Sequence, residues 1–149
     1  MGQPVSWYHK YKYRVEVDGI TRAAFNKCSE LEAEAADVKY KEGGRLHAHH
    51  APGTVEFKEF TLERGACVDK ELWMAWKRTY DAASGTGEDT PDLYFSGDVV
   101  QMNRKGKDVE RYPFIDAYVR AYGSGNWDND ADEVRIEKIT IQPDSFDRE

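Results

Sequence analysis

The segment 53–83 constrains the fold more than any other part of the chain, because it joins a strand, a glycine corner and the one convincing helix. Its first half alternates apolar with charged residues, which is the period of a strand with one buried face. Gly65 ends this run, and Asp69 stands where a helix-capping side chain is expected. We therefore predict a strand over 53–64 and a helix over 69–83.

The predicted helix carries a heavy apolar face. Its large side chains recur three, four, seven and eight positions apart, so they share one side of the helix. The helix-packing candidates are Leu72, Trp73, Trp76 and Tyr80. Each buried aromatic ring removes roughly 150–250 Å² from water, so we expect a broad sheet or another subunit to cover this face. Trp73 and Trp76 could instead stack on bases or a ligand, but core packing is favoured for an apolar helix face.

The rest of the chain is predicted to be strands and turns, which makes the fold mainly β (α+β). Alternating patterns predict strands over 11–17, 23–31, 36–41, 94–103, 109–122 and 133–142. The pair Asp18-Gly19 is a strong hairpin signal between the first two of these strands, and Phe25 and Leu31 are core candidates of the second. Gly- and Pro-containing stretches predict loops over 41–53 and 84–91 and a hairpin turn over 104–107.

Length and composition indicate one domain spanning 1–149, with 143–149 expected to be a mobile tail after Pro143. The chain is 40% hydrophobic and 13% aromatic, enough to build a core. Its net charge of −7 argues against sequence-independent DNA binding, which needs a positive surface. No apolar run approaches the roughly eighteen residues of a membrane span, so no stable membrane insertion is expected.

Three predicted strands change phase midway. The apolar positions move by one residue within 53–64, 94–103 and 133–142, which sends them to the opposite face. A β-bulge or a strand that crosses between two sheets would explain this. The alternative is that one end of each strand is buried against a neighbouring subunit. The segment 115–122 favours the second view, because alternate positions are apolar (Ile115, Ala117, Val119, Ala121) and the tyrosines flanking Arg120 lie on the other face.

Candidate chemistry is sparse. His47, His49 and His50 lie near Glu42 and could bind a metal, but their spacing matches no recognised zinc pattern, so a solvated loop is favoured. The acidic stretch 126–133 offers oxygen ligands for calcium, yet it lacks the EF-hand order and is better explained as a solvated turn.

The remaining reactive side chains also give no case for catalysis. Cys28 and Cys67 have no paired spacing and are expected to be reduced, partly buried thiols. Trp127 stands alone in the acidic stretch, so its burial partner must come from elsewhere in the fold or from another chain. No nucleophile–base pair is visible. We expect no metal, no cofactor and no enzyme.

A series of motifs along nearly the whole chain resembles the contractile-tail tube proteins. The motifs are VEVDGI at 15–20, CSELE at 28–32, YKEGG at 40–44, HHAPG at 49–53, TLERG at 61–65, LWxxW at 72–76, GxGxWD at 123–128 and EVRIEKITIQP at 133–143. They are most similar to inner-tube subunits of extracellular contractile injection systems, relatives of myophage tail tubes and of the type VI secretion Hcp ring.

This resemblance implies a two-sheet β-sandwich or split barrel with one flanking helix, like Hcp and tail tubes. It implies homo-hexameric rings that stack into a tube inside sheath subunits, with baseplate and tube-terminating proteins as further partners. Luminal protein, or DNA in a phage, would pass through. The particle would assemble in the bacterial cytoplasm, and an extracellular injection system would be released.

The resemblance also suggests which residues make contacts between subunits. The ring-stacking candidates are Glu42, Gly43, Gly44, Arg45, His47, His49 and His50. The ring-closure candidates, from the strands 94–103 and 109–122, are Tyr118, Arg120, Tyr122, Val100 and Met102. Two other functions stay open: a secreted Hcp-like ring that carries effectors, and a monomeric β-barrel that binds a ligand through Trp73, Trp76 or Trp127.

Overall fold

The computed structural model describes residues 7–17, 25–84 and 93–149. Its elements are β1 (Tyr13–Val17), β2 (Lys27–Cys28), β3 (Ala33–Tyr40), β4 (His49–Phe57), β5 (Phe60–Gly65), α1 (Glu71–Ser84), β6 (Phe95–Met102), β7 (Asp108–Gly123), β8 (Ile136–Gln142) and β9 (Ser145–Phe146). The turn predicted at Asp18-Gly19 and nearly all of the loop predicted over 84–91 lie outside the described residues.

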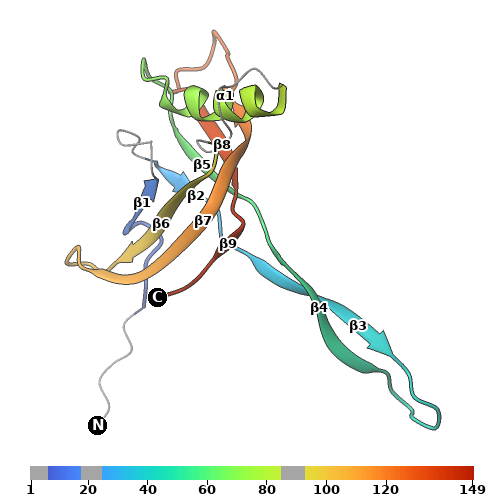
Figure 1. The fold of residues 1–149 in the computed structure, drawn as a ribbon. Coiled ribbons are helices and arrows are strands. Elements are labelled where there is room, and N and C mark those ends of the chain that lie inside the picture. The colour runs from blue at the N-terminus through green and yellow to red at the C-terminus, as the bar shows by residue number, and fades with distance from the viewer. Residues whose placement is uncertain (1–6, 18–24, 85–92) are drawn as a thin grey trace, which may run out of the picture.

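The long strand β7 organises the main sheet. This antiparallel sheet of seven strands has the order β1-β6-β7-β8-β5-β2, and β9 also pairs with β7 (Figure 1). β7 pairs with β6 through its first ten residues and with β8 through its last six, so it belongs to both halves of the sheet. The helix α1 lies across the β7–β8 end (Figure 1).

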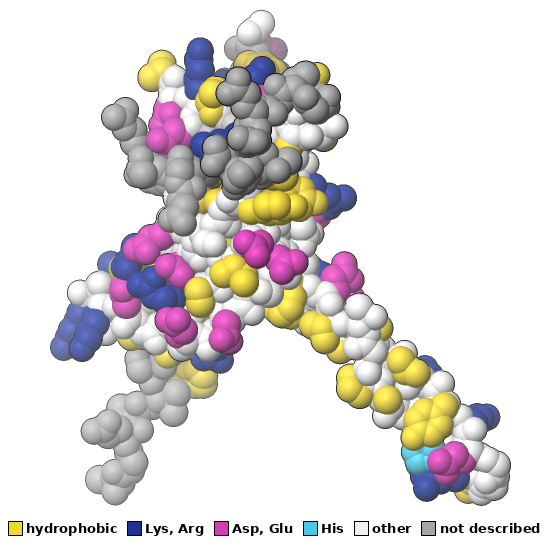
Figure 2. Space-filling model, viewed as in Figure 1, with side chains coloured by type: hydrophobic (Ala, Val, Ile, Leu, Met, Phe, Trp, Pro, Cys, Tyr) yellow, Lys and Arg dark blue, Asp and Glu magenta, His cyan; other side chains and the backbone are white. Residues whose placement is uncertain are grey.

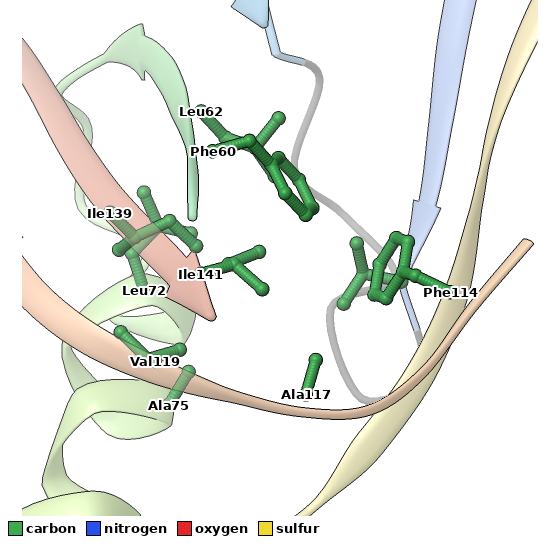
Figure 3. Close-up of a cluster of buried hydrophobic side chains, with 10 residues drawn as sticks. Phe60, Leu62, Leu72, Ala75, Phe114, Ala117, Val119, Ile139 and Ile141 are labelled. Carbon is green, nitrogen blue, oxygen red and sulfur yellow. The ribbon is translucent and has the colours of Figure 1, made fainter. Parts of the chain in front are cut away.

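The core lies between the two halves of this sheet and the helix. Figure 3 shows side chains from β5, β7, β8 and α1 pointing toward one another. The fully buried ones include Phe60, Leu62, Leu72, Phe114, Val119, Ile139 and Ile141. The rings of Phe60 and Phe114 meet edge to face, with centroids 5.3 Å apart, which is a favoured geometry for aromatic pairs.

The helix begins as predicted but presents a different face. The carboxylate of Asp69 accepts a hydrogen bond of 3.0 Å from the backbone N–H of Glu71, so Asp69 caps the helix. Each residue turns the helix by about 100°, which places Leu72 and Trp76 toward the sheet and Trp73 and Tyr80 to one side. Leu72 is fully buried and Trp76 packs against the core. The expected core packing is wrong for Tyr80, which is 58% exposed, and only partly right for Trp73, which is 44% exposed.

The strands β3 and β4 form a second antiparallel sheet, a hairpin that we call the arm. The arm projects away from the rest of the molecule (Figure 1), and every residue of β3 is exposed. The predicted loop 41–53 is therefore too long: His49 to Gly53 belong to β4. Gly- and Pro-rich composition suggested a loop, but an exposed two-stranded arm needs only its own cross-strand hydrogen bonds.

The predicted strand 53–64 is two strands in different sheets. β4 ends at Phe57 in the arm, and β5 begins at Phe60 in the main sheet. The phase change in this segment is thus a crossing between sheets, which confirms the first explanation here.

The apolar positions of the last predicted strand do change face, but β8 achieves this without a bulge or a crossing between sheets. β8 begins at Ile136 and buries Glu137, Ile139 and Ile141 in regular alternation. The buried position nearest its start holds a charged residue, Glu137, whereas Ile136 lies on the opposite face and is 38% exposed. Val134, which precedes β8, is 71% exposed.

The first two predicted strands do not form a hairpin. β1 pairs with β6, and β2 pairs with β5. The predicted core candidates Phe25 and Leu31 do pack against the core, each partly buried.

The C-terminal segment 143–149 is not a free tail. β9 pairs with β7, and backbone hydrogen bonds of 2.8–3.1 Å continue from Asp144 to Glu149. The ring of Phe146 packs edge to face on Phe57, 5.0 Å away. Pro143 ends β8, but the chain then continues alongside the same edge of β7.

The predicted mainly β fold with one helix and two antiparallel sheets is confirmed. The second sheet is the arm, not a layer stacked on the first. Among the described residues, no helix has the length and apolar content that crossing a membrane requires.

Candidate assembly surfaces

The ring-stacking candidates lie at the tip of the arm. Gly44 has a φ of 86°, which favours glycine, and turns the chain between the strands. Arg45 approaches Glu42, with Nε 3.5 Å from Oε2, and lies 3.4 Å from Nδ1 of His49. The ring of His49 stacks on Tyr40 with centroids 5.0 Å apart. The tip is therefore held by contacts within the arm itself.

The three histidines do not converge on one point. His50 Nδ1 lies 2.8 Å from Asp37 on β3, whereas His47 and His49 meet only through their rings, 5.9 Å apart. Within the described ranges no group of three His, Cys, Asp or Glu side chains is arranged to hold a metal ion.

The arm is apolar on opposite faces in its two halves. Near the body the cross-strand pairs Ala33–Phe57 and Ala35–Val55 share one face. Between Ala35 and Asp37 the register shifts, because β4 has one extra residue there. Beyond the shift, Val38, Tyr40 and Ala51 lie on the other face. Figure 2 shows hydrophobic side chains along the arm and charged ones at its tip.

The face opposite the apolar one near the body is acidic. Glu34 and Glu56 are direct cross-strand partners, and like charges in such pairs are destabilising. Lys58 lies 3.3 Å from Glu34 and 3.9 Å from Glu32, which partly offsets this repulsion.

One ring-closure candidate belongs to the subunit itself. Val100 is fully buried, so the expectation that it contacts a neighbouring subunit is wrong. Its cross-strand partners Arg14 and Arg111 flank it on the outer face of the β1-β6-β7 sheet. Met102 is partly buried, and its sulfur accepts a 3.7 Å contact from Arg14.

The other three candidates lie along the end of β7. Tyr118 is partly buried and contacts Tyr94 edge to face, with ring centroids 6.4 Å apart. Arg120 is exposed and pairs with Glu59. The hydroxyl of Tyr122 donates a 3.0 Å hydrogen bond to Glu137. This hydroxyl is therefore already bonded within its own chain.

The predicted alternation over 115–122 holds for Ala117 and Val119 but is wrong for Ile115 and Ala121, because β7 is irregular on both sides of the buried pair. Asp116 has a φ of 49°, and Phe114 and Ala117 are both buried although they are three residues apart. Ile115 consequently faces solvent, at 49% exposure.

A network of ion pairs covers the outer face of β1, β6 and β7. Arg14 binds Asp108 through both terminal nitrogens, at 2.6 and 2.8 Å, and Glu16 at 2.7 Å. Arg111 lies 2.7 Å from Asp98 and 3.6 Å from both Glu16 and Asp108. The hydrogen bonds from Arg14 lower the pKa of Asp108 and of Glu16. Charges that are satisfied within one chain leave this face little tendency to bind another.

The helix end of the molecule combines exposed apolar and acidic side chains. Trp127, in the connection between β7 and β8, is 75% exposed and lies over the guanidinium of Arg135, 4.8 Å from ring to charge. Trp73 contacts Tyr122 edge to face at 5.4 Å and lines a cleft with Met74. Arg135 thus contacts the Trp127 ring but does not bury it, so the expected burial partner is not found within the described residues.

The two cysteines differ. Cys28 is partly buried as expected, and burial raises the pKa of its thiol to about 11. Cys67 is exposed, so the expected partial burial is wrong for this residue. Both are free thiols.

One known protein family matches this chain over most of its length. A family model described as "T4-like virus tail tube protein gp19" matches residues 9–147. The chain belongs to this tail tube family. It is therefore a tail tube protein, a structural component and not an enzyme. No curated protein sequence matches the chain.

Solved structures agree with this tail tube fold. A chain in the cryo-EM structure of the anti-feeding prophage cap, described as its tube terminating cap, is 16% identical with a TM-score of 0.81, covering 100% of this chain and 95% of that one. A chain in the sheath-tube complex of the extracellular contractile injection system PVC is 17% identical with a TM-score of 0.76, covering 95% and 90%. Hcp1 from Flavobacterium johnsoniae is 17% identical with a TM-score of 0.54, covering 93% and 94%. At these identities the likeness is one of fold.

Sequence reasoning missed two features of this tube protein. The buried charges of Arg64 and Glu137 were visible as the next alternate positions after Phe60 and Leu62, and before Ile139 and Ile141. The arm was missed because its outer half reads as a polar loop. The signal for it was the alternation of Val38 and Tyr40 with charged residues, which the prediction assigned to an ordinary strand.

Proposed function

We propose that this tail tube protein forms homo-hexameric rings that stack into a hollow tube inside a contractile sheath. The observation that carries the proposal is the arm, which exposes apolar side chains on opposite faces in its two halves. Val38 and Tyr40 are each 50% exposed, Val55 is 59% exposed and Leu46 is fully exposed. Apolar surface of this kind marks a protein interface. Because such side chains are exposed on both faces of the arm, we expect both faces to contact neighbouring copies.

Six-fold closure is supported by the similar structures. The anti-feeding prophage baseplate that contains one similar chain was solved with six-fold symmetry. Head-to-tail contacts between identical copies form a closed ring when the rotation from one copy to the next closes, here after six copies. The edge strands β1 and β2 of the main sheet would face the neighbouring copies, which removes exposed edges. Met102, Tyr118, Arg120 and Tyr122 remain the candidate side chains for ring closure.

The whole chain acts as one tube domain in this proposal. Sheath subunits, baseplate proteins and a tube-terminating protein would surround the tube, since similar chains occur in structures described by those names. Protein cargo, or DNA in a phage, would pass through the lumen. The particle would assemble in the bacterial cytoplasm, and an injection system would then be released from the cell.

Electron microscopy of the purified protein tests the proposal. We expect rings with six-fold symmetry and stacked tubes of the same diameter. The arm is tested by Tyr40→Ser/Leu46→Ser, which should leave rings but shorten the tubes, because it removes exposed apolar side chains at the tip. Tyr11→Ser removes an aromatic ring of similar exposure, 65%, away from the arm and should leave the tubes unchanged. A protein that stays monomeric at every concentration and ionic strength would contradict the proposal.

A further inference from the structure

The arm tip and the β7–β8 connection lie at opposite ends of the molecule (Figure 1). The connection leaves β7 beside the helix, where Tyr122 contacts Trp73. It returns beside the same helix, where Arg135 and Trp73 line one cleft. The arm points away from this end. If rings stack with all chains in the same direction, the arm tip of one ring faces the helix end of the next.

The arm tip carries an excess of positive charge. Residues 39–50 contain Lys39, Lys41 and Arg45 against Glu42, a net charge of 3 − 1 = +2 with neutral histidines. Arg45 pairs with Glu42, whereas Lys39 and Lys41 have no ion-pair partner within the part of the chain that the structure describes. Lys39 lies on the face of β3 opposite Tyr40, and Lys41 follows the end of the strand.

The β7–β8 connection carries the opposite charge. Residues 126–135 contain four carboxylates against one cation, a net charge of 1 − 4 = −3. The carboxylates are those of Asp128, Asp130, Asp132 and Glu133. Arg135 is occupied by the Trp127 ring and by the carbonyl oxygen of Ser124, at 2.6 Å. No ion pair joins any of these four carboxylates to a cation among residues 7–17, 25–84 and 93–149.

Both ends also offer apolar anchors. The connection exposes 75% of Trp127 and 71% of Val134. The arm tip exposes the whole of Leu46. Aromatic and aliphatic side chains surrounded by complementary charge are typical of protein interfaces, where the charges set orientation and partner.

We infer that the arm tip of one copy docks on the β7–β8 connection of a copy in the next ring. Lys39 and Lys41 face the carboxylates of 128–133, and Leu46 lies against Trp127 and Val134. Because the two surfaces are different and lie at opposite ends, the contact cannot close between two copies and continues as a stack with one direction. The inference rests on the proposed stacking of rings and names the surface that receives the arm.

Charge exchange tests the docking. Lys39→Glu/Lys41→Glu and Asp130→Lys/Asp132→Lys each place like charges across the contact, and each should reduce mean tube length at least about tenfold while rings persist. The protein that carries all four substitutions restores opposite charges and should regain long tubes. Lys105→Glu/Lys107→Glu makes the same change in net charge on the exposed β6–β7 turn and should form tubes of wild-type length.

Tube length is measured by negative-stain electron microscopy, and ring integrity by sedimentation velocity. Restoration of tubes by the fourfold variant, with neither pair alone assembling, supports the docking. Tubes of wild-type length in either charge-reversal variant would overturn the docking. A fourfold variant that forms only rings would also overturn it. A wild-type protein that never forms rings contradicts the proposed function before any charge is changed, so the two failures are distinguishable.

Discussion

Arg64 and Glu137 form a salt bridge inside the protein: Nε of Arg64 lies 2.8 Å from Oε1 of Glu137, and only 4% and 7% of the two side chains are exposed. The pair joins β5 to β8. It extends to the helix, because Arg64 also donates to the backbone carbonyl of Asp69 at 3.3 Å. Tyr122 on β7 donates to the second oxygen of Glu137. One ion pair thus connects three strands with the helix cap.

Loss of one partner of this pair should be severe. Glu137→Gln removes the nearer carboxylate of the buried Arg64 and leaves only Asp69, whose Oδ2 lies 3.8 Å away, so it should cost about 3 kcal/mol of the free energy of unfolding. Arg64→Met/Glu137→Leu removes both charges and should recover most of that loss. Urea denaturation of dissociated subunits measures both.

An exposed ion pair provides the control. Glu63 lies 3.8 Å from Lys27, which is 76% exposed, so Glu63→Gln should cost no more than about 1 kcal/mol. Equal losses for Glu63→Gln and Glu137→Gln would contradict the special role of the buried pair.

Gly97 is required by close packing between β1 and β6. A Cβ at this position would overlap the carbonyl oxygen of Glu16 and come within 2.7 Å of the Phe114 ring. Gly97→Ala should therefore lower the free energy of unfolding by about 1–3 kcal/mol. Gly43, at the arm tip, has nothing within 4 Å of such a Cβ, and Gly43→Ala should change stability by no more than about 0.5 kcal/mol. Thermal unfolding distinguishes them, and similar melting temperatures would refute the packing argument.

The contribution of Asp108 to stability should depend on pH. Arg14 lowers the pKa of Asp108 in the folded state below its ordinary value of 3.8. A carboxyl with a lowered folded pKa stabilises the protein above its unfolded pKa, and this stabilisation is lost as the pH falls through the folded value. Asp108→Asn should thus lower the melting temperature at pH 7 but make a progressively smaller difference below about pH 4.

Asp144→Asn is the matched control for this pH dependence, since Asp144 is exposed and no salt bridge joins it to a cation in the described part of the chain. It should have little effect at either pH. A difference between wild type and Asp108→Asn that stays constant from pH 7 to pH 3 would mean that the ion pair does not stabilise the fold.

The two thiols should react at very different rates. A thiol with a pKa of about 11, as for Cys28, is ionised to only about one part in a thousand at pH 8, and the thiolate is the reactive form. Iodoacetamide at pH 8 should label the exposed Cys67 and spare Cys28, as read by mass spectrometry of the intact protein and its peptides. Raising the pH toward 10 should increase labelling of Cys28 in the folded protein. Rapid labelling of Cys28 at pH 8 would show that burial does not suppress ionisation of its thiol.

Local patterns were sufficient for the elements that obey them. The Asp69 cap and the helix that follows depend on residues adjacent in sequence, so they were predicted closely. Strands such as β6 and β7 were located within one residue at each end, because period-two alternation is a property of each strand alone. The family motifs, spread over the whole chain, were enough to indicate a tube protein.

The sequence alone determined the mainly β character, the single helix and the membership of a tube family. Only the tertiary structure decided that β1 pairs with β6, that the arm leaves the body, and that Val100 and Glu137 are buried while Trp73 and Tyr80 are not. The physical reason is that burial depends on which distant segments meet. A charged residue such as Glu137 can occupy an inward position because Arg64, 73 residues away, supplies its counter-charge, and no local pattern contains that partner.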